Sequence, residues 1–153
     1  DNSIAWGIVE TISDLPEFPR ELSIYVVEGY WTGNSLNVRR YSLRMDGFVS
    51  LQAPLSGGEM VTKPLRFQGS KLLLNYSSSG GGGLWVELQD EQGSPIEGFT
   101  EMDADEVFGD HIEGSVSWKG NQDVSSLAGK SVRIRFILKD ADLYSFRFNG
   151  KSK

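Results

Sequence analysis

The sequence contains no cysteine and only one histidine, His111, among its 153 residues. Without cysteine the chain can form no disulfide framework, no thiolate metal site and no thiol nucleophile. A single imidazole falls short of the several that are usual at catalytic zinc sites, and no Gly-x-Ser-x-Gly motif precedes it to build a serine hydrolase triad. These absences exclude several common classes of enzyme.

Long apolar runs and an excess of positive charge are also missing. No run approaches the roughly 20 apolar residues that cross a bilayer, and the 15 Lys and Arg are outnumbered by 21 Asp and Glu. A net charge of -6 and a pI near 4.8 argue against a general affinity for nucleic acid. We expect neither a membrane nor a nucleic acid as a partner. We interpret the start at Asp1 as a processed terminus or a boundary within a larger protein.

The clearest pattern that is present is an alternation of apolar and polar residues with a period of two. Within residues 131–139 the side chains of Val132, Ile134, Phe136 and Leu138 share one face, as in a half-buried strand. Residues 143–148 alternate in the same way, and residues 139–142, with the polar Lys139, Asp140 and Asp142, connect the two segments. We predict a closing β-hairpin there.

Further short alternating segments are separated by Gly-containing turns. They are residues 22–27, 38–44, 48–53, 65–67, 71–76, 84–90 and 112–118. Together they predict an all-β protein, a two-sheet antiparallel β-sandwich of the jelly-roll kind with little helix. Length and composition predict one domain, 1–153. Residues 77–83, a Ser run followed by a Gly run, are predicted to be a mobile hairpin connection, because no Lys-Ser/Thr or helix follows to make a phosphate loop.

An acidic stretch lies between the predicted strands 84–90 and 112–118. Its carboxylates include Asp103, Asp105 and Asp110, and hard cations such as Ca²⁺ prefer oxygen ligands of this type. The spacing does not match a helix-loop-helix calcium site. A solvated acidic loop, a calcium site and a pair of glycosidase carboxylates are all compatible with the pattern. Calcium is the only cofactor that the sequence suggests.

Aromatic and arginine residues are the candidates for ligand binding. Tyr30 and Trp31 precede a turn-like segment, and Trp118 precedes Asn121 in another, so each ring is a candidate platform for a sugar face. Core packing is the alternative for each of these rings, and also for Trp85 within its alternating strand. A second candidate surface is a set of arginines that the predicted hairpin places on one side, where they are suited either to acidic polysaccharide or to pairing with Asp and Glu. These are Arg133, Arg135 and Arg147.

Several strings resemble the C-terminal region of large bacterial proteins related to family 32 glycoside hydrolases. They are residues 21–31 (ELSIYVVEGYW), 39–50 (RRYSLRMDGFVS), 127–136 (LAGKSVRIRF) and 140–148 (DADLYSFRF). In that family a five-bladed propeller carries the catalytic acids and a β-sandwich follows it. This chain is too short for the propeller, so the resemblance implies an accessory sandwich and transfers no catalytic residue. It also implies that residues 1–45 belong to a junction with the propeller.

Three functions of different classes stay open at this point. The first is a non-catalytic carbohydrate-binding module of a secreted bacterial protein, extracellular or periplasmic, with polysaccharide or oligosaccharide as its ligand. The second is a structural accessory domain that packs on a glycoside hydrolase catalytic domain of the same parent chain. The third is a small β-sandwich enzyme that degrades polysaccharide. Exposed aromatic rings would favour the first, and a large apolar patch would favour the second.

Overall fold

The computed structural model describes residues 3–16, 18–31 and 33–150, and within them the chain forms two compact units. Unit 1 spans 1–48 and unit 2 spans 49–153. Each unit contains an antiparallel sheet, and the helical content of the described residues is limited to two short 3-10 turns, η1 (Gly33–Ser35) and η2 (Ser125–Leu127). The prediction of an all-β protein with two antiparallel sheets and little helix is therefore confirmed. The sequence predicted one domain with a junction over 1–45; the boundary between the units falls at Phe48 and Val49.

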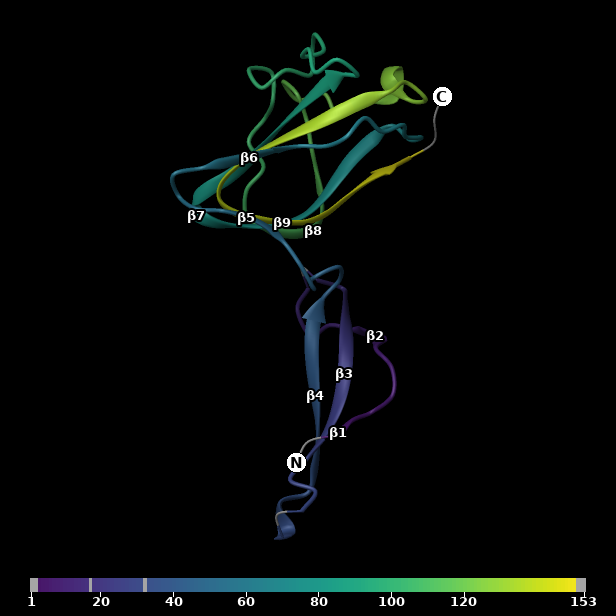
Figure 1. Ribbon diagram of the computed structural model, residues 1–153, viewed down its shortest axis with the longest axis vertical. Coiled ribbons are helices and arrows are strands. Elements are labelled where there is room, and N and C mark those ends of the chain that lie inside the picture. Colours follow the sequence, from purple (N-terminus) through teal and green to yellow (C-terminus); the bar gives the residue numbers. More distant parts are fainter. Residues whose placement is uncertain (1–2, 17, 32, 151–153) are drawn as a thin grey trace. The chain divides into compact units, whose positions relative to one another are not determined.

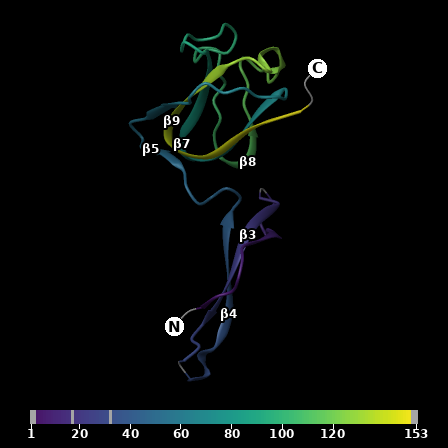
Figure 2. The ribbon, with the colours of Figure 1, turned by 45° about the vertical axis from the view of Figure 1, so that its right-hand side comes forward.

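Unit 1 is built around strand β3 (Arg20–Glu28). Strand β4 (Asn37–Arg44) pairs with one edge of β3, and β1 (Ser3–Ile4) and β2 (Val9–Ile12) pair with its other edge. Figure 2 shows β3 and β4 running side by side. The result is a single antiparallel layer whose centre is a β-hairpin.

The two faces of this layer differ in polarity. Leu22, Ile24 and Val26 of β3 lie on one face, whereas Ser23 lies on the other and exchanges a 2.7 Å hydrogen bond with Thr11. Among the described residues of unit 1, Ser23 is the only one that is fully buried, and no apolar side chain reaches that state. The described part of unit 1 therefore contains no buried apolar core beneath the apolar face of its sheet.

Unit 2 is organised by two long strands, β7 (Lys71–Asp90) and β9 (Val132–Asn149), which pair antiparallel along almost their whole length. Shorter strands complete the sheet on either side of this pair, as Figure 1 shows. They are β5 (Leu51–Ala53), β6 (Gly58–Val61) and β8 (Asp110–Ser115).

Both long strands turn a corner halfway along their length, and the corner makes the sandwich. On β7 the register jumps from Ser78 to Gly83, and on β9 the same interval is spanned by Asp140, whose φ is 42°. The extra residues on β7 form a bulge, which bends a strand sharply without ending it. The first half of β7 and the second half of β9 thus form one layer, and the second half of β7 and the first half of β9 form the other.

This geometry corrects two predictions. Residues 131–139 and 143–148 do not pair as a closing hairpin, because both are parts of β9 and both pair with β7. Residues 77–83 are not a loop between strands, because they lie within β7. Glycine and polar residues favour a turn in either setting, so the local sequence does not distinguish a strand corner from a hairpin tip.

The core of unit 2 lies between the two layers. Leu72 and Leu74 come from the first half of β7, Leu84 and Val86 come from its second half, and all belong to one buried cluster. Their alternation along β7 places every second side chain in this cluster. The residues between them face outward on the second layer, and these outward positions carry the site described next.

Candidate functional site

Tyr30 and Trp31 lie where the sequence predicted an accessible turn. They follow β3 at the tip of the β3–β4 hairpin, and their side chains are 55% and 75% exposed. The two rings contact each other edge to face, with centroids 4.8 Å apart. The two rings are therefore close to perpendicular and do not form one flat surface for stacking a sugar.

Trp118 does not form the surface platform that the sequence suggested as one alternative. It is 2% exposed, and its indole Nε1 donates a 2.7 Å hydrogen bond to the backbone carbonyl of Val86. Phe99 packs edge to face on the same indole at a centroid distance of 5.1 Å. Trp118 is a core residue because the sandwich provides both an apolar environment and a partner for its only polar atom.

Asn121 closes a tight turn next to Trp118. The backbones of Trp118 and Asn121 exchange hydrogen bonds of 2.8 and 2.9 Å around Lys119 and Gly120, which both have positive φ. This is the two-residue turn that a right-twisted hairpin prefers. The Asn121 Oδ1 atom accepts a 3.0 Å hydrogen bond from the backbone N–H of Asp123. The amide therefore has a local structural partner.

Arg135 is the centre of an ion-pair network on the outward side of the second layer. Its guanidinium donates to Glu59 at 2.8 Å and to Glu101 at 2.9 Å, and it lies 3.6 Å from Glu87. Hydrogen bonds to Glu59 and Glu101 raise the pKa of Arg135 above its ordinary value. Three carboxylates around one guanidinium leave little capacity for an acidic ligand.

Glu87 is the buried member of this network. It is 4% exposed, it accepts a 2.8 Å hydrogen bond from the Gln89 amide, and it accepts another of 3.0 Å from the backbone N–H of Glu101. Burial acts to raise the pKa of Glu87, but these hydrogen bonds and the nearby Arg135 together hold that pKa below its ordinary value. Glu87 is therefore a charged structural group.

Arg133 and Arg147 are also engaged, and the structure separates them. The Arg133 guanidinium donates to the carbonyl oxygens of Glu91 at 3.0 Å and Thr62 at 3.2 Å. Arg147 pairs with Glu113 at 2.5 Å and lies in the other half of β9. The prediction of one arginine face was wrong because it depended on the closing hairpin. Pairing with local acceptors, the plainer of the two interpretations, describes these arginines.

The calcium candidates have protein donors of their own. Asp103 accepts a 2.8 Å hydrogen bond from the Thr100 hydroxyl and pairs with Lys119, while Asp105 accepts from Ser117 at 2.6 Å. The contact with Lys119 for Asp103, and with Ser117 for Asp105, holds the pKa of each carboxyl below its ordinary range. These two side chains cross-link their loops.

Asp110 is placed differently from the other two candidates. It is the first residue of β8 and pairs with Ser77 of β7. Across residues 3–16, 18–31 and 33–150, no group of three or more Asp, Glu, His or Cys side chains is arranged to hold a metal ion. The acidic stretch thus forms loop cross-links and a strand start.

A hollow on the outward side of the second layer contains an aromatic residue that the sequence interpretation assigned to the core. Trp85 of β7 is half-buried and lines a depression of about 420 Å³. Pockets of this size are typical of sites for small ligands. The other lining residues come from the turn before β6, from β6 itself and from β9; they are Leu55, Ser56, Gly57, Gly58, Glu59, Ile137, Leu138 and Lys139.

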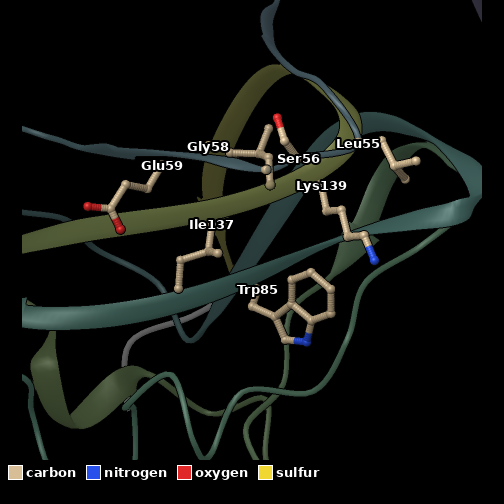
Figure 3. A pocket seen from close by; sticks show the side chains of 9 residues that line it. Leu55, Ser56, Gly58, Glu59, Trp85, Ile137 and Lys139 are labelled. Atoms are coloured by element: carbon tan, nitrogen blue, oxygen red, sulfur yellow. The ribbon is translucent and has the colours of Figure 1, made fainter.

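The strand register explains how this hollow forms. Trp85 pairs with Ile137 of β9, and Ile137 pairs in turn with Glu59 of β6, so the three residues form one row across three strands. Figure 3 shows the Glu59 carboxylate at one end of the hollow and the Lys139 ammonium at the other, with Trp85 and Ile137 between them. An aromatic ring and an aliphatic side chain are thus flanked by polar groups.

Glycine keeps one wall of the hollow low. Gly57 has a φ of 86°, a conformation that residues with a Cβ rarely adopt, and its N–H donates to the Pro54 carbonyl at 2.8 Å. Gly58 follows it at the start of β6, opposite Leu138. This turn therefore contributes backbone rather than side-chain bulk beside the Trp85 ring.

A signal for Trp85 was present in the sequence. Leu84, Val86 and Leu88 alternate as the inward face of the strand, so Trp85 shares its side with Glu87 and Gln89. The period-two pattern places Trp85 on the outward face, although the general tendency of Trp to be buried suggests the opposite.

Comparisons with protein-family profiles, with curated proteins and with solved structures find no match for this chain. In the described part of the chain, no helix is long and apolar enough to span a membrane. The functional argument therefore depends on the geometry of the residues themselves.

Proposed function

We propose that this chain is a non-catalytic carbohydrate-binding module of a larger, secreted, polysaccharide-active protein, and that unit 2 holds the glycan in the Trp85 hollow. The observation that carries the proposal is the half-buried indole of Trp85 in an open depression of about 420 Å³. A polysaccharide ligand is consistent with an extracellular or periplasmic location.

The chemistry of the hollow suits a pyranose. One face of a sugar ring carries C–H groups that stack on an indole, while the hydroxyls at its edge need hydrogen-bond partners. Trp85 and Ile137 supply the apolar floor, and Ser56, Glu59 and Lys139 supply polar groups around it. The hollow therefore offers a pyranose both a stacking surface and polar partners. The edge-to-face pair of Tyr30 and Trp31 offers no comparable flat surface.

The proposal is tested by screening the full chain on a glycan array and then measuring its retention on an immobilised form of the best ligand. We expect Trp85→Ala to abolish retention and Trp31→Ala to preserve it, because only the first residue lines the hollow. Melting temperatures show whether each variant is folded. Retention that survives Trp85→Ala in folded protein would contradict the proposed site, and an array without any selective signal would contradict the proposed function.

A second candidate function is favoured by a separate observation in unit 1. Within the described residues of unit 1, no second layer covers the apolar face of the sheet, and Ile4 and Ile12 are 73% and 83% exposed. Exposed apolar faces of this kind mark sites of protein association. Unit 1 would then be the part of a structural accessory domain that packs on a catalytic domain of the same parent chain.

This second candidate is tested by mixing the full chain with a separately produced catalytic domain of the parent protein in analytical ultracentrifugation. We expect a complex that Ile24→Asp disrupts, because an uncompensated carboxylate at the centre of a buried face is costly. The variant Ser42→Asp, on the other face of the same sheet, is the control. Absence of a complex with the unmodified chain would remove this candidate.

A further inference from the structure

We infer that the Trp85 hollow selects an acidic sugar, a pyranose that carries a carboxylate or a sulfate group. This inference depends on the proposed glycan-binding function and adds the ligand class. The observation behind it is Lys139, an exposed cation at one end of the hollow. Among the described residues Lys139 has no ion-pair partner, unlike Arg135 on the same strand.

The other charged group of the hollow is already neutralised. Glu59 accepts two hydrogen bonds from Arg135, from Nε at 2.8 Å and from Nη2 at 2.5 Å. Its carboxylate is therefore held toward the ion-pair network rather than presented to a ligand as an open charge. Only the cationic end of the hollow carries a charge without a counter-charge among the described residues.

The spacing along β9 separates the charge of Arg135 from that of Lys139. Arg135 and Lys139 are separated by four residues of an extended strand, which corresponds to roughly 13 Å at about 3.3 Å per residue. This separation exceeds the Debye length of about 8 Å at physiological ionic strength. Of the acidic residues around Arg135, only Glu59 reaches the hollow, opposite Ile137, and its charge is already paired with Arg135.

The kind of cation also limits the ligand. A lysine ammonium is a compact point charge on a flexible stem, so it accepts a carboxylate or a sulfate in several orientations. A sugar ring stacked on Trp85 has its substituents at the ring edge. The Lys139 side chain lies beside Trp85 in the hollow, where it can contact such a substituent. The geometry thus combines a stacking surface for the ring with a cation for one anionic substituent.

The test uses an array in which each of several sugar backbones is present in neutral, uronic and sulfated forms of equal length. We expect binding to concentrate on the acidic forms of one backbone, and the uronic and sulfated arms identify which anion is preferred. Equal binding of neutral and acidic forms would overturn the acidic-sugar inference and leave the proposed function standing. A blank array from folded protein would overturn both.

A matched pair of variants assigns the preference to one residue. Lys139→Gln removes the cation of the hollow, whereas Lys130→Gln makes the same charge change at an exposed position before β9. We expect Lys139→Gln to weaken binding of the acidic ligand about fivefold, the upper range for an exposed ion pair. Lys130→Gln should leave affinity unchanged. Equal effects of the two variants, or no effect of Lys139→Gln, would contradict the assignment.

Discussion

The indole Nε1 of Trp118 donates a 2.7 Å hydrogen bond to the backbone carbonyl of Val86, and the residue before Val86 is Trp85. One tryptophan thus packs inside the sandwich against the second half of β7, while the other projects from the outward side of the same strand. Side chains of β7 alternate between its two faces, so Trp85 lies on the outward face while Trp118 packs against the inward face. Trp118 therefore belongs to the core, and Trp85 is the tryptophan to which we assign the proposed ligand binding.

The first prediction compares these two residues in stability. Trp118→Ala should lower the free energy of unfolding by about 3–5 kcal/mol, because it leaves a cavity and an unpaired carbonyl in the core. Trp85→Ala should cost considerably less, since its ring is only half-buried. Urea denaturation of the full chain measures both values. A smaller loss for Trp118→Ala than for Trp85→Ala would contradict the assignment of Trp118 to the core.

The second prediction concerns the corner of β7. A Cβ added at Gly82 would lie 2.4 Å from the carbonyl oxygens of both Lys139 and Asp140, whereas one added at Gly81 meets nothing within 4 Å. Gly82→Ala must therefore displace backbone and should destabilise unit 2 by roughly 1–3 kcal/mol. Gly81→Ala should change stability by less than about 0.5 kcal/mol.

Thermal unfolding of the two glycine variants distinguishes a packed corner from a free loop. A lower melting temperature for Gly82→Ala alone is the expected result. If both variants have the melting temperature of the unmodified chain, residues 80–83 would be an unpacked hairpin tip. That result would contradict the continuous strand β7.

These outcomes also show how far the sequence could predict the fold. The alternation of Val132, Ile134, Phe136 and Leu138 predicted a half-buried strand, and these side chains are in the core. The prediction failed at Asp140 and at the glycines opposite it, where turn-forming residues bend strands that continue. The corner is determined by pairing between β7 and β9, which are distant in sequence. Local residue preferences do not predict that pairing.

The candidate site was predictable to a similar extent. Tyr30 and Trp31 were correctly placed beside a turn, and Asn121 was correctly placed in one. The position of Trp85 could be read from the alternation around Val86, but its partners in the hollow could not. Glu59 and Lys139 line the same hollow as Trp85 because β6 and β7 pair with opposite edges of β9.

The third prediction concerns the dependence of stability on pH. Because the pKa of Glu87 is lower in the folded protein than its ordinary value of 4.5, folding favours its charged form. The stability that this charge contributes is fully present above the unfolded pKa and is lost as pH falls through the folded pKa. The melting temperature of the unmodified chain should therefore fall below about pH 4.5.

Glu87→Gln should remove this part of the acid dependence, so that its melting temperature falls less steeply below that pH. Glu97→Gln, at an exposed position, is the matched control and should follow the unmodified chain. Melting curves between about pH 2 and pH 7 supply the comparison. Parallel curves for all three proteins would show that the ion-pair network around Arg135 does not hold Glu87 charged.

The central claim is that Trp85 stacks on a glycan, and the most direct measurement follows the indole N–H signals in a ¹H–¹⁵N NMR titration with the best array ligand. The chain has four tryptophans, Trp6, Trp31, Trp85 and Trp118, and Trp→Phe variants assign their signals. We predict that the Trp85 signal shifts with saturable dose dependence while that of Trp118 stays in place. A shift confined to Trp31 or Trp6, with Trp85 unchanged, would contradict the account.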